Sequence, residues 1–191
     1  MKSSLHSTLL HSTKWLACII ACAAGIASAS VLNINGDTTD DPVWNRPLSG
    51  NPPTGLSGVG TAVRYEATGF QVNSNGAYDF LASSVFDNFL FVYQTVFIPA
   101  NPLSNVIRGD DDSGPGSNAQ MTGLVLSAGT QYYLVFTSFN NADFGVYSTS
   151  ITGAGNNTAF LTDPQNPAPL PGSLALLALG IFGLVAKRRI G

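Results

Sequence analysis

Apolar and polar residues alternate along the middle of the chain with the two-residue period of β-strands. In Ala77 to Ala82, Tyr78 and Phe80 fall on the face opposite Asp79. The segment from Val85 to Ile98 is apolar on both faces, which is typical of a strand inside a sheet. The same patterns predict further strands at 31–35, 61–72, 121–126, 130–139 and 144–151. Because Asn, Gly, Pro and Asp separate strands spaced about ten residues apart, we predict an all-β antiparallel sandwich rather than βαβ units.

Two segments rich in Gly, Pro, Ser and Thr flank or interrupt this region. Residues 36–60 are expected to form a long loop pinned by Trp44. Residues 153–168 are expected to be an exposed linker, because they have little β propensity. The predicted organisation is therefore a leader at 1–29, a β-sandwich ectodomain at 30–152, the linker at 153–168, and a C-terminal segment at 169–191.

The leader has the charged, apolar, small-residue order of a secretory signal peptide. Two lysines precede the apolar run at 15–26, and the small residues Ala27, Ser28 and Ala29 follow it. We expect cleavage between Ala29 and Ser30. Two alternatives stay open, namely an uncleaved anchor and a bacterial lipoprotein in which Cys22 is lipidated.

Cleavage after Ala29 has a chemical consequence, because it removes every cysteine and histidine of the chain. These residues are Cys18, Cys22, His6 and His11. The mature chain then lacks the residues of a disulfide framework, a Ser-His-Asp triad, a Cys-His dyad or a His/Cys zinc site. We therefore predict a protein that is not an enzyme. The remaining catalytic alternative is a hydrolase that relies on carboxylates such as Glu66, Asp79 or Asp87.

The charge distribution bears on the choice of partner. All eleven acidic residues lie between Asp37 and Asp163, where only three arginines accompany them, which gives this segment a formal charge of −8. Nucleic-acid binding needs clustered cations, so this balance argues against a nucleic-acid partner.

An acidic stretch at 108–117 is the feature of the predicted domain that best suggests a ligand-binding site. It groups Asp110, Asp111 and Asp112 with flexible glycines, and hard oxygen ligands on a flexible turn suit calcium. The ligand spacing of an EF-hand loop is missing, and a solvated turn is the alternative. The tripeptide that starts at Arg108 is also an RGD sequence, which allows a weaker reading as an adhesion motif.

The C-terminal segment combines an apolar run with a basic end. Residues 174–186 are apolar throughout, but as a helix they would span only about 20 Å, against about 30 Å of bilayer hydrocarbon. Lys187, Arg188 and Arg189 would stay in the cytoplasm by the positive-inside rule. This pattern predicts a short transmembrane helix in the inner membrane, with the domain outside.

The order Pro169, Leu170, Pro171 and Gly172, followed by an apolar stretch and a basic cluster, resembles the PEP-CTERM sorting signal of Gram-negative bacteria. Leu170 stands where that family usually has Glu. The resemblance implies recognition by an exosortase-type processing enzyme, which would cut near the motif. The domain would then pass from a transient inner-membrane intermediate to the cell surface or the exopolysaccharide matrix.

The body carries a second resemblance, to bacterial pre-peptidase C-terminal-like domains. Segments 76–80, 91–93, 110–112 and 126–135 follow the order seen in that family. This resemblance implies a jelly-roll-like sandwich, some relatives of which bind calcium or polymers. We therefore expect an exported protein with a structural or adhesive role; the alternatives are a calcium- or carbohydrate-binding module and, more remotely, the carboxylate-based hydrolase.

Overall fold

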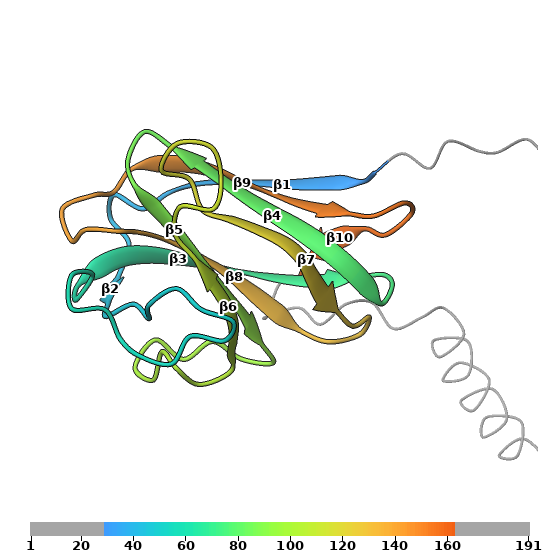
Figure 1. Cartoon of the computed structure of the whole chain (residues 1–191), viewed down its shortest axis with the longest axis horizontal. Helices are drawn as coiled ribbons and strands as arrows, with labels where there is room; N and C mark the ends of the chain where they lie inside the picture. Colours follow the sequence, from blue (N-terminus) through green and yellow to red (C-terminus); the bar gives the residue numbers. More distant parts are fainter. Residues whose placement is uncertain (1–28, 163–191) are drawn as a thin grey trace, which may run out of the picture.

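The computed structural model describes residues 29–162, which fold into two antiparallel β-sheets packed face to face (Figure 1). This arrangement confirms the predicted all-β antiparallel sandwich. The ten strands are β1 (Val31–Asp37), β2 (Val43–Trp44), β3 (Val63–Val72), β4 (Gly76–Ser84), β5 (Asn88–Gln94), β6 (Val106–Asp110), β7 (Gln120–Leu126), β8 (Tyr132–Ser138), β9 (Val146–Gly153) and β10 (Ala159–Leu161). Over residues 29–162 there is no helix with the length and apolar character needed to cross a membrane.

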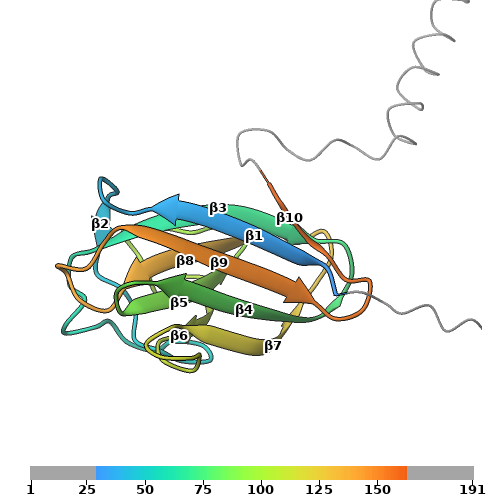
Figure 2. The ribbon, with the colours of Figure 1, turned by 90° about the horizontal axis from the view of Figure 1, so that it is seen from above.

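The two sheets differ in strand order. The four-stranded sheet has the order β1-β9-β4-β7 and faces the viewer in Figure 2. The six-stranded sheet has the order β10-β3-β8-β5-β6, and β2 also pairs with β3. Every pairing is antiparallel.

Seven strands occupy predicted segments, with shifted ends. Strand β5 is buried on both faces, as its continuous apolar pattern indicated. It is shorter than the predicted segment 85–98, because the chain turns at Thr95, whose φ is 73°. A threonine in this left-handed region is uncommon, so the apolar pattern gave no sign of the turn.

The main core lies between the sheets and is aromatic-rich. Phe136 of β8 and Tyr147 of β9 stack across the interface with ring centroids 3.7 Å apart. Phe70 and Phe80 make a similar cross-sheet contact at 5.9 Å. Tyr132 and Tyr147 are both buried, so these two rings belong to the core.

A second core lies on the outer face of the six-stranded sheet, beneath two loops. Trp44 packs edge-on against Phe91 and Phe97, with centroids 5.6 and 5.3 Å away. Its indole Nε1–H donates to Thr137 Oγ1 at 3.3 Å. Trp44 therefore pins the long loop as predicted, and this face of the sheet is covered rather than exposed.

Two short strands differ from the sequence-based expectation. Strand β6 begins at Val106 and ends at Asp110, so the first three residues of the predicted acidic turn at 108–117 are sheet. Strand β10 lies inside the segment 153–168 that we expected to be a linker, and it pairs with residues 70–72 of β3. The low β propensity of segment 153–168 is offset in β10 by backbone hydrogen bonds with the edge of β3.

The acidic residues are concentrated at one end of the sandwich. Seven of them lie in or beside the loops that join β1 to β2, β4 to β5, β6 to β7 and β8 to β9: Asp37, Asp40, Asp41, Asp87, Asp111, Asp112 and Asp143. The opposite end carries the loops 73–75, 127–131 and 154–158, which contain no charged residue. Ser30 lies at this uncharged end, paired through its carbonyl oxygen with the N–H of Gly153.

Candidate functional site

The three predicted calcium ligands have different surroundings. Asp110 ends β6 with its side chain buried, and its carboxylate accepts hydrogen bonds from the Ser113 Oγ–H at 2.7 Å and from the Gln120 N–H at 2.8 Å. This carboxylate therefore closes the turn after β6. The calcium site predicted at Asp110, Asp111 and Asp112 stays a prediction, and burial of Asp110 takes that residue of the RGD tripeptide off the surface.

Asp87 takes the place that we expected Asp110 to fill. It lies in the short connection between β4 and β5, which the strand order brings beside the loop after β6. One carboxylate oxygen from each of Asp87, Asp111 and Asp112 falls within 4.8 Å of the others. We call these three residues the acidic triad. A polar Asp-Asn pair inside an apolar run is the sequence signal that could have marked the turn at Asp87.

The acidic triad is electrostatically strained. Burial and the negative charges of Asp112 and Asp87 raise the pKa of the Asp111 carboxyl to about 6, although Arg46 pulls this pKa down. Burial also raises the pKa of Asp87, again with help from Asp112. Among the described residues, Asp87 Oδ1 and Asp111 Oδ1 are inaccessible to solvent and accept no hydrogen bond. Such oxygens are better satisfied by a proton or a cation than by each other.

Arg46 is the cation nearest to the acidic triad, and it is only 2% exposed. Its guanidinium lies between the rings of Phe89 and Phe139, 4.1 and 5.0 Å from their centroids. It donates to the carbonyl oxygens of Pro47 and Phe139, both at 3.1 Å. Burial lowers the pKa of Arg46, while Asp111 and Asp87 raise it. Arg46 therefore offsets part of the negative charge and ties the long loop to the sheet. Its role was not predicted from the sequence.

The donor set of the acidic triad fits a hard divalent cation. Three carboxylates supply oxygen ligands of the kind that Ca²⁺ prefers, and Asp112 is exposed, so an ion could enter from solvent. Residues Asp87, Asp111 and Asp112 would hold such an ion. The role of a bound cation there would be structural, because it would link the loop before β5 to the loop after β6.

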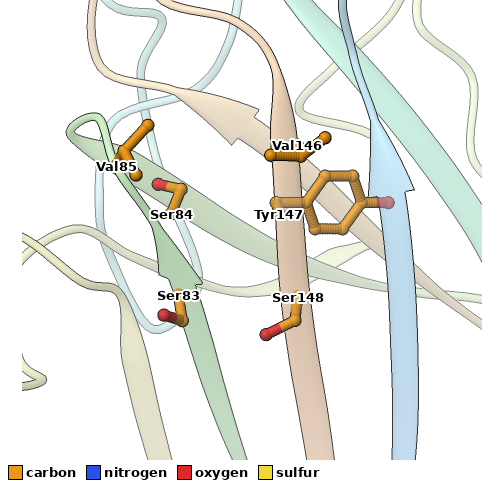
Figure 3. Close-up of a pocket in the computed structure, with 6 residues that line it drawn as sticks. All are labelled: Ser83, Ser84, Val85, Val146, Tyr147 and Ser148. Carbon is orange, nitrogen blue, oxygen red and sulfur yellow. The ribbon is translucent and has the colours of Figure 1, made fainter.

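A separate hollow of about 290 Å³ opens on the outer face of the four-stranded sheet. Figure 3 shows the lining serines of the neighbouring strands β4 and β9 together with Val85 and Val146. Val85 is 95% exposed and Val146 is 64% exposed. The Tyr147 ring lies beside β1 in the same view. The serine hydroxyls give this hollow hydrogen-bonding capacity without a carboxylate, and the valine methyl groups give it apolar surface.

The other carboxylates considered for hydrolysis have different surroundings. Asp79 Oδ1 accepts a hydrogen bond from the Gly123 N–H at 2.7 Å, which holds the bulge between β4 and β7. Glu66 lies beside Tyr147 and accepts a hydrogen bond from its hydroxyl, and burial followed by this carboxylate raises the pKa of Tyr147. Asp79, Glu66 and Asp87 thus serve three separate places in the fold.

Most residues of the predicted processing signals lie outside the described residues. These are Ala27, Pro169, Leu170, Pro171, Gly172, Lys187, Arg188 and Arg189. Ala29 and Ser30 are described, directly before β1. No protein-family model and no curated protein matches this chain.

Proposed function

We propose that this chain is an exported, non-enzymatic, jelly-roll-like domain that is processed at both ends and delivered to the bacterial surface or the exopolysaccharide matrix, where its role is structural or adhesive. The observation that carries this proposal is the fit of the folded domain between the two processing points. Strand β1 begins directly after Ser30, and strand β10 ends at Leu161, eight residues before the motif at Pro169.

The end contacts support processing without loss of structure. The Ser30 carbonyl oxygen accepts a hydrogen bond from the Gly153 N–H at 3.3 Å, and the Thr162 N–H donates to the Gly69 carbonyl oxygen at 2.9 Å. Cleavage after Ala29 and near Pro171 would keep both contacts. An exosortase-type enzyme and the inner membrane would then be transient partners rather than permanent ones.

The use of polar side chains inside the domain supports a scaffold role. Asn88 is fully buried, and it accepts from the Ala119 N–H at 2.9 Å and donates to Asn118 Oδ1 at 2.7 Å. Asp110 and Asp79 likewise accept hydrogen bonds from backbone N–H groups of β7, at Gln120 and Gly123. These side chains hold the loops in place.

The test is the intact mass of the protein recovered from a Gram-negative host that carries an exosortase. We expect a polypeptide that starts at Ser30 and ends near Pro171. A matched pair of variants probes the signal: Pro171→Ala should block C-terminal processing, whereas Pro167→Ala, outside the motif, should leave it unchanged. A mass that retains Arg188 and Arg189 would contradict sorting, and a lipid-modified start at Cys22 would contradict cleavage after Ala29.

A calcium-binding module is the second candidate, and the acidic triad favours it. Its two solvent-inaccessible oxygens without hydrogen-bond donors, on Asp87 and Asp111, are the specific observation. Thermal melting with calcium, with magnesium and with a chelator tests this candidate. We expect calcium to raise the melting temperature of the parent but not of Asp112→Asn. Equal melting temperatures with calcium and with chelator would exclude calcium, and retention on polysaccharide columns would separately support carbohydrate binding.

A further inference from the structure

The four sheet edges of the described domain are unequally protected. Strand β7 has a register shift against β4 and a glycine at φ 66°, Gly123. Strand β6 is capped by an antiparallel bridge between Gly50 and Gly109, and β10 has only three residues. Bulges, covering loops and short strands are the usual devices that prevent edge pairing. Strand β1 has none of them.

Strand β1 is a regular edge of seven residues. It pairs with β9 without a register shift from Val31 to Asp37, and it contains no proline, lysine or arginine. The Ser30 carbonyl and the Thr38 N–H both bind β9-side partners, at Gly153 and Gly145. Because backbone groups alternate in direction, the N–H and C=O groups of the odd-numbered residues must point away from β9.

These outward backbone groups are free within residues 29–162. The residues concerned are Val31, Asn33, Asn35 and Asp37, whose N–H and C=O groups have no hydrogen-bond partner there. All four side chains are exposed as well. A row of free backbone groups on an accessible strand is a template for another strand.

We propose that β1 pairs with β1 of a second copy of this chain, antiparallel and about a two-fold axis at Ile34. In this register Asn33 lies opposite Asn35 of the second copy, and Val31 lies opposite Asp37. It is the two-fold register that uses all four outward residues, and it forms about eight backbone hydrogen bonds. The two four-stranded sheets become one continuous sheet.

Side-chain complementarity selects a second copy as the partner. Side-chain amides face each other in the two Asn33–Asn35 pairs, and amide groups can donate to and accept from one another. Asp37 is the only charged residue of β1, and in this register it faces a valine. The two Asp37 carboxylates lie at opposite ends of the joint, so like charges do not oppose each other.

Hydrogen exchange measured on the full chain tests this pairing, because strand β1 can be followed amide by amide. The amides of Leu32 and Ile34 face β9 and should be protected at every protein concentration. The amides of Asn33 and Asn35 should exchange fast in dilute protein and become protected as the protein concentration rises. Their protection should increase over the same concentration range in which analytical ultracentrifugation detects the dimer. Fast exchange of both at all concentrations would overturn the proposal.

Two matched pairs of variants sharpen the test. Asn33→Pro removes one outward N–H from each copy as well as the amide side chain, and should raise the dimer dissociation constant at least ten-fold, whereas Asn33→Ala keeps that N–H, loses only the amide pair and should raise the constant by a clearly smaller factor. Asn35→Lys should also weaken the dimer, but Ser148→Lys, its neighbour on the same face of β9, should not. Equal effects within either pair, a monomer at every concentration, or pairing only with a different protein would overturn the proposal.

Discussion

Replacing Asp111 with Asn removes the carboxyl whose pKa departs most among the described aspartates. Asp111 titrates near pH 6 in the folded domain, against an ordinary aspartate value of 3.8. The folded state therefore holds this proton more tightly than the unfolded chain does. Below about pH 4 the carboxyl is protonated in both states, so Asp111→Asn should then have almost no effect on stability.

At neutral pH, ionisation of the Asp111 carboxyl lowers the stability of the folded domain. As the pH rises from about 4 to about 6, the unfolded chain loses its proton first, and the folded domain loses stability. The full cost of ionising Asp111 is at most about 3 kcal/mol. Because the Asp111 side chain is only half-buried, solvent screens part of this effect, and we reduce the expected cost to about 1–2 kcal/mol. Asp111→Asn should therefore stabilise the domain by that amount at pH 7.5.

Urea unfolding at pH 4 and pH 7.5, with a chelator present, measures this difference. Trp44 is buried against aromatic rings and is the only tryptophan after residue 29, so its fluorescence reports unfolding of the domain. Asp40→Asn is the matched control, because it removes the same charge from an exposed loop position. The reasoning would be refuted if Asp111→Asn stabilised the domain equally at both pH values, or if it gave no increase in the free energy of unfolding at pH 7.5.

Three further substitutions test the packing. Asn88→Ala leaves the Ala119 N–H without an acceptor and should cost about 2–3 kcal/mol in urea unfolding. Trp44→Ala leaves a cavity in the second core and should lower the free energy of unfolding by about 3–5 kcal/mol, measured by circular dichroism. Gly36→Ala would bring a methyl group within 2.6 Å of the Tyr147 ring and should lower the free energy of unfolding by about 1–3 kcal/mol in urea.

One substitution serves as the control for all three. Ser148 is exposed on β9, and Ser148→Ala should change the free energy of unfolding by less than about 0.5 kcal/mol. A buried-site variant that matches this control would show that the corresponding contact contributes nothing to stability. A destabilised control would instead assign a packing role to the exposed face.

The strands that the sequence predicted are those whose own side chains carry the signal. Aromatic and β-branched residues dominate β5 and β8, and alternation marks β4. Strand β6 contains Gly109 and an aspartate, which disfavour strands locally. Its glycine is required there, because a Cβ at Gly109 would lie 2.5 Å from the Phe91 ring. That requirement comes from tertiary packing, so local propensity could not reveal it.

The acidic triad was predicted in part for a related reason. Residue type alone drew attention to Asp111 and Asp112, and the structure keeps both in the candidate cation site. Asp87 and Arg46 join them through strand order and loop packing, which link positions far apart in the chain. Asp110 is not part of this cluster, and its carboxylate accepts hydrogen bonds from the N–H groups of Ser113, in its own turn, and of Gln120, which begins β7.

The separation of the acidic loops from the uncharged end gives the sandwich a permanent electric dipole. Near a negatively charged surface, such a dipole experiences a torque that turns the acidic loops away and the uncharged end inward. The orientation needs no specific contact, and dissolved salt screens it at distances beyond about 10 Å. A domain released beside an anionic membrane would thus leave it with the acidic triad leading, before any partner is met.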